Sequence, residues 1–251
     1  NIMAIPTPPA GTPEECAKNA ERINQRIQAG LELLRKHYTV AECEVDQVLA
    51  NPVVGGRPHH ARRFDIEGVG NLLVMSVTEA EAGQLSSFVI TPYAKNLPMF
   101  SSDYVYSGSM RFFLMEIYDL AVRHDETFEN GLATFAAFKD AWTDMPDFPV
   151  QPCWYDEIRP VCLAKGYAPA QDELAIERFL EVLGVFIELE QATPTLTGED
   201  LQKKWQLNHD YANRLIDEGG VSTNLFTQSI GAENTRRFFH EVFFGPACYQ
   251  P

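Results

Sequence analysis

Residues 40–118 alternate short runs of β-branched and aromatic residues with turn residues, which is the pattern of consecutive β-strands. The pattern predicts strands over 41–50, 61–67, 71–78, 86–93, 103–107 and 110–118. The connections are too short for crossover helices, so neighbouring strands must be antiparallel. The last strand places Phe112 and Leu114 on one face and Phe113 on the other. A sheet that is apolar on both faces needs cover on both faces.

Apolar residues at helical spacing predict the helices that supply this cover, over 13–38, 127–143, 171–191, 199–217 and 232–244. Thr12 and Glu15 form a capping box at the start of the first helix, and we expect Thr197 to cap the fourth. The expected fold is a three-layer α/β/α sandwich around a central antiparallel sheet, formed by a single domain over 1–251. Residues 1–11 are expected to form an arm, and 144–170 a long loop with one strand.

The charge of the chain narrows the range of partners. The 35 acidic residues exceed the 20 basic ones, for a formal net charge of -15. This balance opposes non-specific binding to nucleic acid or to an anionic membrane surface. No apolar run approaches the roughly 20 residues that span a bilayer. The five cysteines are scattered and form no CxxC pair, which is typical of reduced thiols in a cytoplasmic compartment.

The common motifs of cofactor and metal sites are missing from the sequence. There is no GxGxxG after a strand, no P-loop, no HExxH, no paired CxxC and no GxSxG. His59 and His60 are adjacent, and on a strand they would point to opposite faces, which favours a loop pair over a pair of metal ligands. The sequence therefore predicts no metal site.

The segment 97–105, LPMFSSDYV, holds the most informative carboxylate. A turn containing a proline leads into a strand in which Asp103 comes early. Asp103 either caps a turn in solvent or projects from the sheet into a pocket lined by Met99 and Phe100. In the second case, burial would raise its pKa and hold a transferable proton near neutral pH.

This segment resembles the LPMFGxDLV motif of the ferredoxin-dependent bilin reductases, including a preceding strand that ends in proline, here FVITP at 88–92. The C-terminal part is also similar to that family. Its order of residues is Tyr211, Arg214, Gly219-Gly220, Leu225-Phe226, Gly231 and Phe243-Phe244. The resemblance covers roughly residues 60–246.

The resemblance implies an α/β/α sandwich that binds a linear tetrapyrrole such as biliverdin between the sheet and the C-terminal helices. It implies no bound flavin, nicotinamide or metal. Electrons would come one at a time from the [2Fe–2S] cluster of reduced ferredoxin, and protons from side chains, through bilin radicals. Asp103 falls on the central aspartate of the family, a proton donor. In an alga or a plant, the compartment would be the plastid stroma.

The second proton donor is left open by departures from the family pattern. The phycocyanobilin-forming branch has a histidine where this chain has residues 85–87, and here Ser86 is a candidate for substrate contact. The branch's glutamate aligns with residues 72–75, although Glu67 or Asp65 would reach the pocket in another register. Other branches place an aspartate where this chain has residues 219–221. Glu116, inside an apolar strand, is a further candidate, with a solvated or paired carboxylate as the alternative.

A bilin carries two propionates, so the site is expected to contain cations. Arg159 resembles a family arginine that serves this purpose, and Arg214 and Lys204 lie on a helix expected to flank the pocket. A guanidinium group binds a carboxylate through two parallel hydrogen bonds. A solvated surface charge is the alternative for each. Trp154 could stack on a pyrrole ring, or belong to the core.

A ferredoxin partner is acidic, so docking on this acidic chain requires a local basic patch. The densest cluster is formed by Arg57, His59, His60, Arg62 and Arg63, with smaller ones at Lys203-Lys204 and Arg236-Arg237. Association at such a patch weakens with salt. Two other functions remain open: a non-catalytic bilin carrier, and a reductase of another open-chain tetrapyrrole such as a chlorophyll catabolite.

Overall fold

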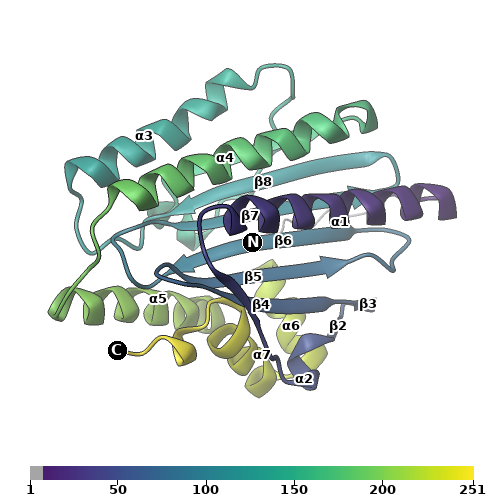
Figure 1. Cartoon of the computed structure of the whole chain (residues 1–251). Coiled ribbons are helices and arrows are strands. Elements are labelled where there is room, and N and C mark those ends of the chain that lie inside the picture. The colour runs from purple at the N-terminus through teal and green to yellow at the C-terminus, as the bar shows by residue number, and fades with distance from the viewer. Residues whose placement is uncertain (1–7) are drawn as a thin grey trace.

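The computed structural model describes residues 8–251 and is built on a seven-stranded sheet within that range (Figure 1). The strands lie in the order β1-β4-β5-β6-β7-β8-β9, and all their pairings are antiparallel, as the short connections predict. Their bounds are Val40–Cys43, His60–Ile66, Gly70–Val77, Gln84–Pro92, Met99–Ser107, Met110–Tyr118 and Val161–Tyr167. A separate two-stranded ribbon pairs β2 (Val53–Val54) with β3 (Arg57–Pro58).

Helices cover both faces of the large sheet, which confirms the predicted three-layer α/β/α sandwich (Figure 1). One face carries α1 (Pro13–Arg35), α3 (Glu126–Ala141) and α4 (Asp172–Ala192). The other carries α5 (Glu199–Glu218), α6 (Val221–Ile230), α7 (Ala232–Phe238) and the π-helical turn Phe239–Phe243. The remaining helical pieces are α2 (Gln47–Ala50) and the 3₁₀ turns Trp154–Ile158, Pro169–Gln171 and Pro246–Cys248.

The alternation of side chains along β7 assigns its residues to two different cores. Phe100 and Tyr104 pack with α1 and α4, whereas Met99 packs with the C-terminal helices. Val105 belongs to a smaller apolar cluster on the C-terminal-helix side. Because Asp103 shares the parity of Met99 and Val105, its side chain must also lie on that side.

Several predicted boundaries were wrong for local physical reasons. The strand expected over 41–50 stops at Cys43, because the Asp46 carboxylate accepts a hydrogen bond from Val48 N and starts α2. Thr197 does not cap α5: the N-cap is Gly198, at φ +58°, a backbone conformation that suits glycine. The capping box of Thr12 and Glu15 is present.

The C-terminal region differs most from the sequence expectation. Helix α6 was not predicted, and the helix expected over 232–244 is α7 followed by the π-helical turn. The stretch 144–170 does contain one strand, β9, as predicted. Of the predicted arm, residues 1–7 lie outside the described residues. Its described end is tied to the sheet, where the Ser107 hydroxyl donates to Pro9 O at 2.5 Å.

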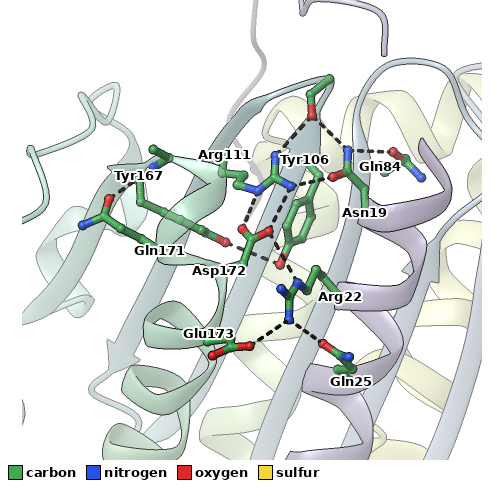
Figure 2. A network of polar contacts seen from close by, with 12 residues as sticks. Asn19, Arg22, Gln25, Gln84, Tyr106, Arg111, Tyr167, Gln171, Asp172 and Glu173 are labelled. Carbon is green, nitrogen blue, oxygen red and sulfur yellow. Dashed lines mark hydrogen bonds and ion pairs between the residues drawn. The ribbon is translucent and has the colours of Figure 1, made fainter. Parts of the chain in front are cut away.

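A buried polar network joins α1 and α4 to the sheet (Figure 2). Figure 2 shows Arg111 of β8 between the two helices. Its guanidinium donates to both carboxylate oxygens of Asp172, at 2.5 and 3.1 Å, and to the Asn19 side chain at 2.8 Å. The Asn19 amide donates in turn to Gln84 at 3.2 Å. A buried charge pair whose remaining hydrogen bonds are satisfied fixes how the helices sit on the sheet.

Candidate active site

A cavity of about 310 Å³ lies between the sheet and the C-terminal helices. Its floor is formed by Met75, Leu85, Ser87, Asp103 and Val105, from three neighbouring strands. Its roof is mostly apolar and includes Leu215 of α5, Thr223, Leu225 and Phe226 of α6, and Phe239 and Phe243 of the π-helical turn. A mainly apolar cavity with a few converging polar groups is the usual form of a small-molecule site.

The roof is fastened to the sheet differently at its two ends. At the π-helical end, the Asn71 amide donates to the carbonyls of Val242 and Phe243, both at 3.1 Å, and the Tyr93 hydroxyl donates to Phe244 O at 2.8 Å. Helix α6 is linked to the β2–β3 ribbon by a hydrogen bond from Gly55 N to the Ser229 hydroxyl at 3.1 Å.

Asp103 lies on the cavity floor, and only 2% of its surface is exposed. It sits on β7, an interior strand of the sheet, directly opposite Ser87 of β6 and Leu114 of β8. The alternation of the strand turns it toward the C-terminal helices. The carboxyl group therefore reaches a largely apolar cavity, as in the second of the two interpretations of its sequence context.

His59 forms part of the cavity wall and is buried. Its Nδ1 lies 2.8 Å from Arg57 O, and because a carbonyl only accepts, Nδ1 must carry the proton. The opposite ring nitrogen, Nε2, is then an acceptor. Burial lowers the pKa of His59, so the imidazole is neutral at pH 7. The ring packs edge-on against Phe226, with centroids 5.8 Å apart.

Arg57 brings a positive charge to the same wall. Its Nη1 donates to Gly83 O at 2.5 Å, and burial lowers the pKa of the guanidinium, which stays charged near neutral pH. Gly83 has φ +70°, and a Cβ there would collide with the Arg57 guanidinium. The glycine therefore serves both the turn and the close approach of the cation.

Glu116 lies beside this site but does not line the cavity. It is completely buried, and it is diagonal to Asp103 because Asp103 pairs with Leu114. Its Oε2 accepts from the Tyr118 hydroxyl and from Arg159 Nη1, both at 2.7 Å. Burial, followed by the charge of Glu116, raises the pKa of Tyr118. Glu116 and Arg159 thus form a buried ion pair under the edge of the site.

Comparison with known proteins identifies the fold. No family model matches the chain, and no curated protein sequence matches it either. Among solved structures, the chain is similar to phytochromobilin synthase from tomato, in complex with biliverdin. The TM-score is 0.72 at 12% sequence identity, over 91% of this chain and 84% of the tomato protein. This chain has the fold of phytochromobilin synthase. The resemblance that the sequence motif indicates is confirmed at the level of the fold.

On this fold, Asp103 is the one member of the predicted site set that lines the cavity within residues 8–251. Met99 lies on the same face of the sheet but is buried outside the cavity lining. Phe100 points to the opposite face and packs against Phe179 of α4. Ser86 also faces α1, because it is adjacent to Ser87, which faces the cavity.

The predicted cations occupy other positions. Lys204 is fully buried, and its ammonium donates to Leu97 O and Leu120 O, both at 2.7 Å. Arg159 is held by Glu116 and by Asp156, the latter at 2.6 Å. These bonds are internal to the protein, so a propionate would have to displace them.

Arg214, Trp154 and Glu67 lie at or near the surface. Arg214 stacks over the Trp154 ring at 4.3 Å and is bonded to Glu157 and Glu218. The Trp154 indole donates to Gly219 O at 3.1 Å. Glu67 is exposed in the turn after β4, at the opposite end of that strand from His59.

Sequence reasoning missed the roles of Arg57 and His59 in the cavity, because both were assigned to a surface docking cluster. Within that cluster, Arg62 is bonded to Glu42 at 2.9 Å and Arg63 to the Asn71 side chain at 2.6 Å. A usable signal was present: Gly55-Gly56 predicts a turn, which would fold Arg57 and His59 back over the sheet.

Residues 8–251 contain no group of three or more His, Cys, Asp or Glu side chains placed to hold a metal ion. In the same range, no helix has both the length and the apolar character needed to cross a bilayer.

Proposed function

We propose that this protein reduces a biliverdin-type linear tetrapyrrole with electrons from reduced ferredoxin, using Asp103 as a proton donor. The observation that carries the proposal is the position of Asp103. A carboxyl group that is 2% exposed lies on the floor of an apolar cavity, in a fold whose tomato representative was solved with biliverdin.

Reduction of one bilin double bond consumes two electrons and two protons. Ferredoxin carries one electron at a time, so the pigment passes through a radical. Asp103 supplies one proton and is left as a carboxylate, which is reprotonated from solvent. Neutral His59 supports this step, because its Nε2 accepts a hydrogen bond from a pyrrole N–H. Glu116 remains a proposed second acid, which would first have to separate from Arg159.

The apolar lining of the cavity and the charge of Arg57 in its wall favour a mainly apolar ligand with anionic groups at one side. Its volume of about 310 Å³ lies at the lower end of the usual range for small-molecule sites. We therefore expect the propionates to leave the cavity along the wall where Arg57 lies. A guanidinium group there can bind a carboxylate through paired hydrogen bonds.

Ferredoxin docking belongs to the same proposal. Its strength is expected to fall with added salt, because complementary charges on exposed surfaces are screened. Arg237 is bonded to Asp46 and Glu241, and Arg236 is bonded to Asn213. These exposed basic groups of the C-terminal helices therefore already have hydrogen-bond partners within the protein. Docking there would exchange these bonds for bonds to the partner.

The test is an anaerobic mixture of the protein, biliverdin and a ferredoxin reducing system, followed by absorption spectroscopy. The wild type should shift the spectrum on binding and then convert the pigment. Asp103→Asn should bind the pigment and stall at a coloured radical, whereas Asp140→Asn, on an exposed position of α3, should behave like the wild type. Binding without conversion would refute catalysis and favour a carrier. Conversion of a chlorophyll catabolite in preference to biliverdin would refute the substrate assignment.

A further inference from the structure

Arg26 is a fully buried cation on α1, on the side of the sheet opposite the cavity. Its guanidinium reaches two serines of the sheet. Nε and Nη2 donate to Ser86 Oγ, at 3.2 and 2.6 Å, and Nη2 also donates to Ser86 O at 2.8 Å. Nη1 donates to Ser102 Oγ at 3.0 Å. The rings of Tyr104 and Phe179 lie 4.2 and 4.7 Å from the guanidinium carbon and shield it from water.

This cation has no adjacent counter-charge. Within residues 8–251, no carboxylate lies within ion-pair distance of Arg26, unlike Arg111, Arg159 and Arg178, the other well-buried arginines. Burying an arginine is costly, and normally a carboxylate close to it offsets the cost. The acidic side chain whose charge acts on Arg26 is Asp103.

The register of the sheet places Arg26 directly behind Asp103. Ser87 of β6 pairs with Asp103 of β7, and both line the cavity. The residues that precede them, Ser86 and Ser102, point to the other face, because consecutive strand residues alternate. These two serines are the residues that hold the guanidinium. Arg26 and Asp103 therefore face each other through one layer of backbone, in an interior where charges are weakly screened.

We propose that Arg26 is a positioning residue that acts through the sheet on Asp103 and stabilises its carboxylate form. The electrostatic part of this proposal concerns the ligand-free protein. Its catalytic consequence rests on the proposed function: the positive charge would stabilise the carboxylate that remains once Asp103 has given up its proton, which favours proton transfer to the substrate.

Other charged and titratable groups lie on the two sides of the sheet and must be held constant. On the side of Asp103 these are Arg57 and His59 in the cavity wall and the Glu116–Arg159 pair beside it. On the side of Arg26 they are Tyr104, Tyr106 and Tyr167, which act on it electrostatically. All of these groups are retained when Arg26 alone is changed, so a difference between variants isolates the effect of its charge.

The experiment is an infrared titration of the Asp103 carboxyl C=O band in the ligand-free protein, with the band assigned by its loss in Asp103→Asn. Arg26→Gln should raise the midpoint of the titration by about one pH unit, the size expected for a unit charge acting through one layer of protein. Arg26→Lys, which retains the charge, should stay close to the wild type. Arg22→Gln is the control: it removes an equal charge one turn earlier on α1, where Arg22 is bonded to Gln25 and paired with Asp172 and Glu173.

An unchanged midpoint in Arg26→Gln would overturn the proposal, and so would an equal rise in Arg26→Lys, which would show an effect of geometry rather than charge. If Arg26→Gln does not fold, Arg26→Met takes its place, because an apolar side chain of similar length removes the charge and buries no polar group of its own. The titration needs neither bilin nor ferredoxin. A failure of the proposed function would therefore leave its result intact.

Discussion

Lys204 should make the stability of this protein rise between pH 7 and pH 9. Its side chain is fully buried, and its ammonium has two carbonyl partners, Leu97 O and Leu120 O. Burial lowers the pKa of Lys204 from 10.5 to about 7, against the weaker opposing charge of Asp119. In the unfolded chain the same group keeps its ordinary pKa.

The sign and the size of the effect follow from proton linkage. Between pH 7 and pH 9 the unfolded chain keeps the proton on Lys204, whereas the folded protein loses it. Because the unfolded state binds more protons, the free energy of unfolding increases with pH. The shift in pKa predicts an increase of about 2 kcal/mol over these two pH units.

Urea unfolding of the wild type, Lys204→Met and Lys203→Met at pH 7, 8 and 9 measures this contribution. Lys203 is the adjacent, exposed lysine and serves as the control. The difference in unfolding free energy between the wild type and Lys204→Met should grow by the stated amount, because every other titrating group is common to both proteins. For Lys203→Met the difference should be independent of pH. Parallel pH profiles for the wild type and Lys204→Met would show that the ammonium stays charged on its two carbonyls, and the reasoning would be wrong.

Two further predictions concern packing and the buried ion pair. Gly30→Ala places a methyl group 2.9 Å from the Phe179 ring and should destabilise the protein by about 1–3 kcal/mol in urea unfolding, whereas Gly184→Ala, with open space around it, should stabilise the protein by about 0.5–1 kcal/mol. Equal effects of the two substitutions would contradict the close contact between α1 and α4. Glu116→Gln leaves the buried Arg159 with Asp156 as its remaining carboxylate partner and should cost about 1.5–3 kcal/mol, part of which Arg159→Met added to the same protein should restore. If the double variant is as unstable as the single one, the cost does not come from the lost ion pair.

The sheet and most helices could be predicted from the sequence, because their patterns are local. The alternation along β8 predicts a sheet that needs cover on both faces, and the capping box at Thr12 marks the start of α1. Helix α6 could not be predicted in this way. Its sequence, VSTNLFTQSI, is rich in Ser, Thr and Asn, which have low helix propensity, and the helix depends on tertiary contacts such as that of Phe226 with Phe238.

The site was only partly predictable. The orientation of Asp103 follows from strand alternation and its neighbours, and the structure places it on the cavity floor. Arg57 and His59 reach the cavity because the β2–β3 ribbon folds back over the sheet. A tertiary contact of this kind leaves no periodic pattern of apolar residues in the sequence. The environment of Lys204 could not be predicted from the sequence for another reason. Its partners are backbone carbonyls, and side-chain identities do not indicate where these carbonyls lie.

The two ends of the cavity roof are attached to the sheet differently, and this difference determines where substitutions can alter the ligand preference of the fold. The amide of Asn71 and the hydroxyl of Tyr93 bind main-chain carbonyls, so the π-helical end keeps its place whatever side chains the roof carries. Helix α6 contributes Thr223, Leu225 and Phe226 to the cavity without such a constraint. Redesign for a ligand of another size would therefore begin at residues 222–226, where substitutions reshape the cavity and leave these main-chain bonds intact.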